Sequence, residues 1–517
     1  MRPFSRRDFL KLSTLIPVGA ILSPLLKNLV SSKVGGQAGS PANIIVVLFD
    51  AMSARNLSVY GYPRNTAPNL MRFADRSNVY HSHNSAGNFT VPGTTSLLTG
   101  LYPWTHRAIN EAGLMTREFI GRNIFRSMGG QYKRLAYAQN LYAGFILSQF
   151  DRDIDVYFPP DSFNTASGIV GNRFPNDFPS AYRSFDDFLF KFDKESSKPA
   201  SASLIFGTIE RLLFLRRLAD AKNTNSQEFP LGLPGDDNYP IYYRLEDVFD
   251  GLISDIRNIK TPTFAYFHLF PPHEPYRPSK EFFVKFFDTY MPPVKPEHPM
   301  SHGISQPALN SHRRRYDEYI AYADSQFGRL LDAIEQAGLF ENSIVVVTGD
   351  HGEFFERGEQ GHATPLLYDP VIHVPLMIST PGQNKRNDIH DPTNSVDVLP
   401  TLLHLTNQPV PDWREGALLP GLGGTFDPQR SMFSMDAKLN PAFAPFRSAT
   451  IAMRKGAYKL IYYLGYTGDY NDTYELYNLE TDIEEMDNLY AKETTIASQM
   501  KAELLEALHT ANSHFKG

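Results

Sequence analysis

Cysteine does not occur anywhere in the 517 residues of this chain. Disulfide bridges, thiolate metal sites and cysteine nucleophiles are therefore excluded. The chain also has no block of basic residues interleaved with aromatics. With a formal net charge of −6 and a pI near 6.2, it gives no reason to expect nucleic-acid binding. Beyond the N-terminal region, no segment is apolar for long enough to cross a membrane. The sequence does not indicate an oligomeric state.

Residues 1–41 have the composition of an export signal followed by a small, polar linker. Arg6 and Arg7 precede an apolar stretch from Leu12 to Leu26, which is short for a spanning helix. Twin arginines before a short apolar region are typical of Tat signals, so we expect an extracytoplasmic protein, secreted or held at the cell surface or in the periplasm. No clean small-x-small cleavage site follows, and retention as an N-terminal membrane anchor stays open.

From Asn43 onward, short β-branched runs alternate with helical patterns, which predicts an α/β fold with buried parallel strands. A long helix is expected over Tyr316–Ala337, because apolar residues recur there at helical spacing and Gly338 follows. The expected strands are Ile44–Phe49, Arg134–Ala138, Thr263–Phe270, Ser343–Thr348 and Val374–Ser379.

The chain is expected to contain a catalytic domain over 42–425 and a C-terminal subdomain over 426–517. The catalytic domain includes a variable region, 145–258, rich in Phe, Tyr and Pro. Within it, the apolar face of 203–221 is expected to pack on the main domain, with a lid or a membrane-surface helix as alternatives. The C-terminal subdomain is expected to be α+β, with strands at Ala449–Arg454, Tyr458–Tyr463 and Tyr474–Tyr477 and a final helix at Thr495–His509.

Two of the strand runs end on acidic residues, Asp50 and Asp350, and His351 follows the second. Ligands of open α/β sheets bind beyond the carboxyl ends of the strands, so these side chains should meet at one edge. Thr90 opens the run Thr-Val-Pro-Gly-Thr-Thr-Ser-Leu-Leu-Thr-Gly, in which Pro92 suits the first turn of a helix. Such a helix start favours a bound phosphate or sulfate.

A hydroxyl is a poor nucleophile unless a base or a metal ion activates it. Two carboxylates and an imidazole around a divalent ion would lower the pKa of the hydroxyl and hold a tetrahedral oxyanion. We therefore predict one divalent metal ion bound by Asp50, Thr90, Asp350 and His351. Mixed oxygen and nitrogen ligands favour Mn²⁺, Zn²⁺ or Mg²⁺ over Ca²⁺.

Several further motifs stand in order along the chain. They are Asp50 through Tyr60-Gly-Tyr, Thr66-Ala-Pro-Asn-Leu70, Leu101-Tyr-Pro, Phe270-Pro-Pro-His273-Glu-Pro-Tyr276, Thr348-Gly-Asp350-His351-Gly-Glu, Gly361-His362, Val396-Asp-Val-Leu-Pro-Thr and Tyr474-Glu-Leu-Tyr-Asn-Leu. Together with the Thr90 run, they resemble the sulfatase branch of the alkaline phosphatase superfamily over almost the whole chain after residue 41. The resemblance implies an alkaline phosphatase-like sandwich, in which helices flank a mostly parallel, mixed sheet. It also implies Thr90 as the nucleophile and His273 and His362 as catalytic histidines.

The nucleophile run departs from the sulfatase pattern. Sulfatases carry a Cys or Ser, oxidised to formylglycine, in a Cys-x-Pro-Ser-Arg run, whereas this chain has Thr90, with Gly93 for the Ser and Thr94 for the Arg. The family's lysine-containing stretch appears as Ala138-Gln-Asn140, and the lysine expected after His362 is missing. A threonine cannot become formylglycine, and an esterified threonine must be cleared by a second attack at the central atom, which is routine for phosphorus.

We therefore expect an exported, metal-dependent hydrolase of phosphate mono- or diesters or phosphonates, acting on a small-molecule, glycan or lipid-linked ester. Three alternatives stay open: a sulfuric ester hydrolase that works without formylglycine, a transferase of the phosphoglycerol or phosphoethanolamine type, and an inactive binding protein with the same fold. His268, His106 and His373 are expected to be structural. Asn140, at a strand end, could donate to a phosphate oxygen.

Overall fold

The computed structural model describes residues 42–158, 160, 162–165, 201–236, 241–259 and 262–515. The predicted export signal and linker, and residues 166–200 of the predicted variable region, lie outside these residues. Within them, no helix combines the length and the apolar character needed to cross a membrane.

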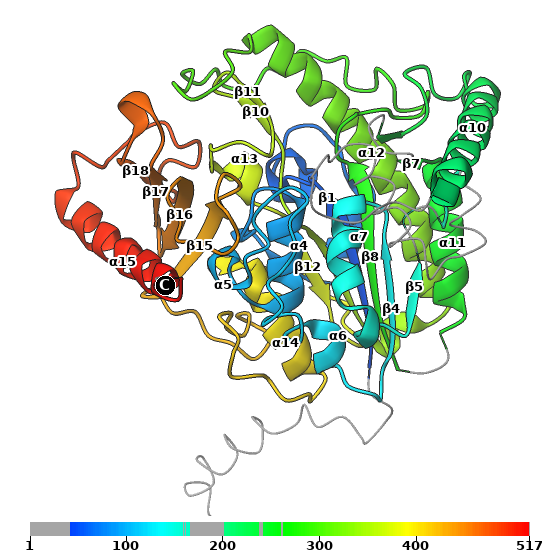
Figure 1. Cartoon of the computed structure of the whole chain (residues 1–517), viewed down its shortest axis with the longest axis horizontal. Coiled ribbons are helices and arrows are strands. Elements are labelled where there is room, and N and C mark those ends of the chain that lie inside the picture. The colour runs from blue at the N-terminus through cyan, green and yellow to red at the C-terminus, as the bar shows by residue number, and fades with distance from the viewer. Residues whose placement is uncertain are drawn as a thin grey trace, which may run out of the picture. The chain divides into compact units, whose positions relative to one another are not determined.

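An eight-stranded sheet forms the centre of the described structure, in the order β13-β2-β12-β9-β1-β8-β4-β5 (Figure 1). Its central strands β9, β1, β8 and β4 pair in parallel, while β12 runs antiparallel to both of its neighbours. The mostly parallel, mixed sheet of the predicted fold class is thus confirmed. The strands are β1 (Asn43–Asp50), β2 (Asn78–Tyr80), β4 (Lys133–Ala138), β5 (Val156–Phe158), β8 (Thr263–Pro272), β9 (Ser343–Gly349), β12 (Leu376–Ser379) and β13 (Asn387–Ile389).

Helices cover both faces of this sheet because its central strands are apolar on both sides. On β1, Ile45 and Val47 pack into a cluster with α11 (Leu245–Arg257) and α12 (Gln306–Gln336). The alternate residues of β1 pack on the opposite face, in a cluster that includes α4 (Thr90–Thr99), α7 (Leu141–Gln149) and α14 (Val398–Leu405). The period-2 alternation of a strand therefore decides which side chains face α4.

All five strands expected in this sheet are present, but three further strands were not expected. β2, β5 and β13 each span three residues, too few to show an alternating pattern. Helix α12 begins at Gln306 rather than Tyr316, because its first turns are mainly polar and apolar periodicity starts only later. The other main-domain elements include α3 (Pro68–Ala74), β3 (His83–Asn84), α5 (Pro103–His106), α6 (Ile124–Ser127), β6 (Gly235–Asp236), β7 (Ile241–Tyr242), β10 (Phe354–Glu356), β11 (Glu359–Gly361), α13 (Asp369–Ile372) and β14 (Thr393–Asn394).

A second, antiparallel sheet of four strands makes up the C-terminal part, in the order β15-β16-β17-β18. Its elements are β15 (Ser431–Asp436), β16 (Ala449–Lys455), β17 (Tyr458–Leu464) and β18 (Thr473–Asn478), followed by α15 (Thr494–Ser513). α15 buries Met500, Leu504 and Leu508 in one apolar cluster with this sheet. The expected α+β subdomain is present with one strand more than expected, and its predicted boundary stays a prediction.

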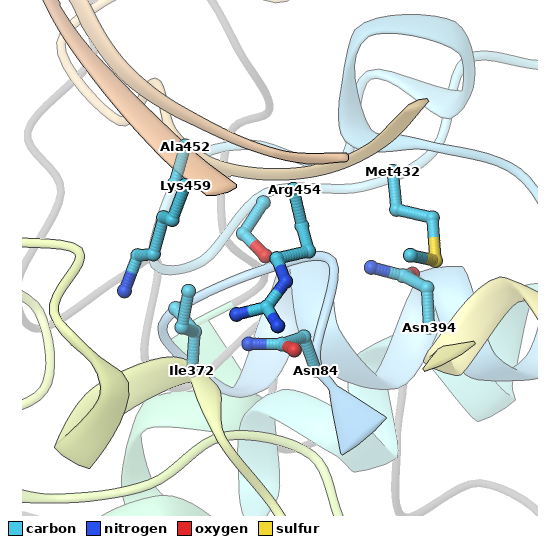
Figure 2. Close-up of a pocket in the computed structure, with 8 residues that line it drawn as sticks. Asn84, Ile372, Asn394, Met432, Ala452, Arg454 and Lys459 are labelled. Carbon is cyan, nitrogen blue, oxygen red and sulfur yellow. The ribbon is translucent and has the colours of Figure 1, made fainter. Parts of the chain in front are cut away.

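A small cavity of about 10 Å³ lies where the C-terminal sheet meets the strands β3 and β14. Figure 2 shows Arg454 reaching from β16 toward Asn84, with Lys459 of β17 on the side of Ile372. The volume is close to the room that a single water molecule needs. We therefore regard this cavity as part of the junction between the two sheets.

Helix α10 (Ser201–Thr224) contains the apolar face that was expected to pack on the main domain. That expectation is wrong for Leu212 and Leu215, which are 62% and 43% exposed, whereas Phe214 and Leu218 are buried. The side that packs is set by tertiary contacts with Tyr242 and its neighbours, not by the largest run of apolar residues. The side chains of Leu204, Ile205 and Ile209 lie outside the described part of the helix.

Candidate active site

The carboxyl ends of β1 and β9 bring three of the predicted metal ligands together. Asp50 ends β1, and Asp350 and His351 directly follow β9, whose register pairs Phe49 with Gly349. One ligand atom from each of the three side chains lies within 4.8 Å of the other two, and all three are fully buried. The structure thus places residues 300 positions apart in one cluster at the sheet edge.

A strained turn fixes the two carboxylates against each other. Ala51 has a φ of 58°, the left-handed region that an alanine seldom adopts. In this conformation its N–H donates to Asp350 Oδ1 at 3.3 Å. The hydroxyl of Tyr316 donates to the carbonyl of Ala51 at 2.5 Å and accepts from the backbone N–H of Ser53 at 2.8 Å. A buried tyrosine of α12 therefore holds the turn that follows β1.

Thr90 lies beside this cluster, as the first residue of α4. Its Oγ1 is 3.5 Å from His351 Nε2 and 3.3 Å from Asn140 Nδ2. The same Asn140 amide donates to Asp50 Oδ2, while its Oδ1 accepts from the N–H of Tyr142 and caps α7. Asn140 thereby joins the candidate nucleophile to one of the candidate metal ligands.

Gly93 lets the start of α4 come close to Asp350. A Cβ built on Gly93 would lie 2.2 Å from the carbonyl oxygen of Asp350. One residue further on, the hydroxyl of Thr94 donates to Asp350 Oδ2 at 3.3 Å. The two positions that replace the Ser and Arg of the sulfatase pattern therefore both contact Asp350.

The titration of the cluster reflects two acids buried side by side. Burial raises the pKa of Asp350, and the neighbouring carboxylate of Asp50 raises it further. Burial acts on Asp50 in the same direction, but His273, His268 and His351 outweigh it and hold the pKa of Asp50 well below its ordinary value. Burial lowers the pKa of His351, but the two carboxylates raise it to about 9. The pair of acids thus attracts positive charge to this point.

Three imidazole rings lie in a row that begins at the cluster. The rings of His351 and His362 are 4.3 Å apart, and those of His362 and His273 are 4.7 Å apart. His273 Nδ1 lies 2.6 Å from the carbonyl oxygen of Glu274, so Nδ1 donates there and Nε2 stays available for other partners. Both predicted catalytic histidines are therefore adjacent to each other and to the cluster.

Glu353 contacts His362 at Nδ1 and fixes the orientation of its ring. Its carboxylate oxygens lie 3.2 and 3.3 Å from His362 Nδ1. Burial raises the pKa of Glu353 to about 7, although His273 and His351 act against the rise. Burial also lowers the pKa of His362 well below its ordinary value, and His351 and His273 lower it further. This carboxylate–imidazole pair fixes which nitrogen of His362 faces the cluster.

A family model for sulfatases matches residues 42–408 of this chain, and a second, for the C-terminal part of N-sulphoglucosamine sulphohydrolase, matches residues 358–511. The chain belongs to the sulfatase family. Arylsulfatase A of Homo sapiens is 22% identical over 444 residues, covering 81% of this chain and 74% of that protein. The ulvan-active sulfatase of Formosa agariphila is 32% identical over 175 residues, a third of each protein's length (33% and 33%).

The match to arylsulfatase K of Bos taurus, at 26% identity, covers 39% of this chain and 37% of that protein's length. Among solved structures, phosphonate monoester hydrolase SpPMH from Silicibacter pomeroyi superposes with a TM-score of 0.62 at 18% identity, covering 91% of this chain and 96% of that one. BT4656, solved with D-glucosamine-2-N,6-O-disulfate, gives a TM-score of 0.63 at 16% identity and covers 92% and 99%. These two likenesses concern the fold.

The Asp50, Asp350 and His351 side chains of this sulfatase-family protein fit a divalent cation. Asp50 Oδ1 is buried and has no hydrogen-bond partner among the described residues, although His351 Nε2 lies 3.2 Å away. His351 Nδ1 is 2.9 Å from the carbonyl oxygen of Gly352, which leaves the Nε2 lone pair directed at the carboxylates. A cation would neutralise the acids and satisfy the free carboxylate oxygen.

Three neighbours of the site were missed by, or given little weight in, the sequence analysis. Asn140 contacts both Asp50 and Thr90, as described above. Lys438, in the loop after β15, donates to the carbonyl of Ala363, next to His362, and adds a positive charge at the site. His268 was expected to be structural, yet its Nε2 lies 3.2 Å from Asp50 Oδ2. His106 and His373 make no contact with the cluster among the interactions of the described residues.

Proposed function

We propose that this chain is an exported, metal-dependent hydrolase that cleaves phosphate mono- or diesters or phosphonates through a covalent Thr90 intermediate. The proposal is carried by the place of the Thr90 hydroxyl, at the start of α4 and 3.5 Å from Nε2 of His351 in the buried acidic cluster. A threonine has no route to formylglycine. The chemistry must therefore proceed through the hydroxyl itself.

We expect one divalent cation, held by Asp50, Asp350, His351 and Thr90, with Mn²⁺, Zn²⁺ or Mg²⁺ favoured over Ca²⁺. When bound, it supplies positive charge that lowers the pKa of the Thr90 hydroxyl and stabilises charge on the substrate oxygens. Asn140 orients both the nucleophile and Asp50 through its amide. Lys438 would attract the anionic group toward the site.

The first step forms a bond between Thr90 Oγ1 and phosphorus as the bond from phosphorus to the leaving oxygen breaks. The Thr90 proton passes to solvent, and the leaving oxygen takes a proton from Nε2 of His273. The ring of His362, 4.7 Å from that of His273, lies beside this proton donor. In the second step water attacks phosphorus and gives a proton to the imidazole of His273. The phosphorus–Oγ1 bond breaks, and Thr90 takes a proton back from solvent.

Sulfate chemistry is less suited to this nucleophile. A formylglycine hydrate releases sulfate by elimination, with regeneration of its aldehyde, and a threonine ester has no equivalent elimination. The threonine ester can be hydrolysed only when water attacks its central atom, and such attack is routine at phosphorus. We therefore place phosphorus esters ahead of sulfate esters as substrates.

Sulfuric ester hydrolysis without formylglycine is the second candidate. It is favoured by the names of the relatives, since arylsulfatase A and the ulvan-active sulfatase are both called sulfatases. Under this reading Thr90 would still be the nucleophile. The two candidates differ in the central atom and therefore in how readily water clears the covalent ester.

The deciding experiment is turnover of a substrate panel by purified, metal-loaded protein. Aryl phosphate monoesters, phosphate diesters, phosphonates and sulfates would be compared in wild type, Thr90→Ala and Thr90→Ser. We expect a phosphorus ester to be the best substrate, with activity lost in Thr90→Ala and partly kept in Thr90→Ser. A preference for sulfate would support the second candidate, and product transfer to added alcohols would indicate a transferase. If none of the esters were turned over, the proposal that the protein is an enzyme would be refuted.

Export rests on a separate feature, the twin arginines Arg6 and Arg7 before the apolar stretch that ends near Leu26. We propose Tat-dependent export of the folded protein, with release or retention by the N-terminal segment both open. An extracytoplasmic location fits glycan or lipid-linked esters as substrates. Replacing both arginines with lysine should leave the protein in the cytoplasm.

A further inference from the structure

His268 lies in the centre of the sheet, on the face that α4 covers. On β8, Phe264 and Tyr266 pack in the same apolar cluster as α4, whereas Ala265 and Phe267 pack in the opposite one. Because side chains alternate along a strand, His268 follows Tyr266 on the α4 face. Its register partners are Leu48 on β1 and Ala138 on β4. His268 therefore stands between β1, which ends at Asp50, and β4, which ends at Ala138, two residues before Asn140.

The distances from His268 to the acidic cluster parallel those from His351. His351 Nε2 is 3.2 Å from Asp50 Oδ1 and 3.7 Å from Asp350 Oδ2. His268 Nε2 is 3.2 Å from Asp50 Oδ2 and 3.7 Å from the same Asp350 Oδ2. The two imidazoles therefore face the two oxygens of Asp50, one each, and are equally far from Asp350.

These separations are those of donor atoms around one ion. With metal–ligand bonds of about 2.0–2.1 Å, the edges of a tetrahedron are about 3.3–3.4 Å long. All four side chains involved are fully buried, so none of them is satisfied by solvent. The histidine on β8 thus lies as close to the two carboxylates as the histidine that follows β9.

Tyr266 provides the contact that a metal-binding histidine needs at its second nitrogen. Its hydroxyl lies 3.2 Å from His268 Nδ1. When Nδ1–H donates to this hydroxyl, the Nε2 lone pair is free to face the carboxylates. Metal-binding histidines generally have such a partner, which fixes the tautomer and the ring orientation.

We propose that His268 is a further side-chain ligand of the divalent cation, so that two carboxylates and two imidazoles hold the ion together with the Thr90 hydroxyl. This inference rests on the metal dependence proposed above and makes it more specific. A second imidazole moves the donor set toward Zn²⁺ and away from Mg²⁺ and Ca²⁺, which prefer oxygen.

The test is metal binding, measured without any substrate. The metal-free protein would be titrated with Zn²⁺ and with Mg²⁺ against a chelating dye, and bound metal counted by elemental analysis after dialysis. We expect His268→Ala to weaken Zn²⁺ binding by about 100-fold or more. Loss of a residue that only orients a metal ligand weakens binding by about 10- to 100-fold, and loss of a ligand itself should cost at least the upper value. Tyr266→Phe should weaken Zn²⁺ binding by about 10-fold. Mg²⁺ binding should weaken less in both variants.

His106→Ala is the matched control. This histidine is also fully buried and has a partner at each nitrogen, 3.0 Å from Ser96 Oγ and 3.0 Å from the N–H of Ala108. It should lose stability and keep its Zn²⁺ affinity. Unchanged Zn²⁺ affinity in folded His268→Ala would overturn the proposal.

If His268→Ala does not fold, the absorption spectrum of Co²⁺ bound to His268→Gln gives the answer. Loss of a nitrogen ligand should shift the Co²⁺ bands relative to wild type, and an identical spectrum would overturn the proposal. Protein that binds metal through His268 and cleaves none of the esters would instead count against the proposed function alone.

Discussion

Replacing Gly93 with alanine tests whether the candidate nucleophile depends on the close approach of α4 to Asp350. The added Cβ would lie 2.2 Å from the carbonyl oxygen of Asp350, and 3.0 Å from its carbonyl carbon. Ordinary contact begins near 3.4 Å, so the two backbones must separate by about 1 Å. Both are buried main chain and cannot swing aside as a flexible side chain would.

A shift of about 1 Å in a catalytic group can lower the rate by about 100-fold. Over-packing a well-packed site also costs about 1–3 kcal/mol of stability. We therefore expect Gly93→Ala to lower kcat/KM by about 100-fold on the best substrate of the panel, with a measurable fall in Tm. Thr90 Oγ1 and His351 Nε2, now 3.5 Å apart, would no longer be held together.

Gly130→Ala is the control for this variant. A Cβ at Gly130 meets no atom within 4 Å, and the backbone there is not in the left-handed region. Its kinetics and Tm should match wild type. If Gly93→Ala also matched wild type in both measurements, the close approach would play no part in positioning Thr90, and the reasoning would be refuted.

Three further predictions concern charge. Glu353→Gln should lower kcat by about 10- to 100-fold with little change in KM, because His362 loses the carboxylate that orients it; equal kinetics would contradict this role. Lys459→Met should lower the free energy of unfolding in urea by about 3–5 kcal/mol, since it leaves the buried carboxylates of Asp369 and Glu485 without their ion pair. The control is Lys455→Met, which removes a pair with Glu503 whose side chains are 20% and 42% exposed, and it should change stability by less than about 1 kcal/mol. Adding metal at about 1,000 times Kd should stabilise the metal-free protein by about 4 kcal/mol, and Asp350→Asn should lose most of that gain.

The central strands could be predicted because each is a continuous apolar run buried on both faces. Ile44–Phe49 and Ser343–Thr348 are of this kind, and both strands extend only one residue beyond the predicted range at their carboxyl ends. The acids that follow these runs, Asp50 and Asp350, could therefore be assigned to one sheet edge from the sequence alone. Thr90 was found from its own run and from the family resemblance.

Strand order could not be predicted, and the missed site residues depend on it. His268 faces Asp50 only because β8 lies next to β1, with β4 on its other side. The alternation of Phe264, Tyr266 and His268 shows that they share a face, but not which neighbour that face meets. The contact of Asn140 with Asp50 also depends on strand order, since Asn140 follows β4 and Asp50 ends β1, with β8 between these two strands.

Lys438 shows a different limit. It lies 75 positions from Ala363, the residue whose carbonyl it contacts, in a loop of the C-terminal sheet. Contacts between two different sheets leave no periodic signal in either segment. The same holds for α10, where packing against Tyr242 buries Phe214 and leaves Leu212 exposed.

The most direct measurement is identification of the residue that becomes covalently modified during turnover. Metal-loaded protein would be mixed with a reactive aryl phosphorus ester, quenched in acid and analysed by peptide mass spectrometry. The account predicts a phosphorus ester on Thr90 in wild type and none in Thr90→Ala, which should also be inactive. Turnover that leaves Thr90 unmodified, together with activity in Thr90→Ala, would contradict it.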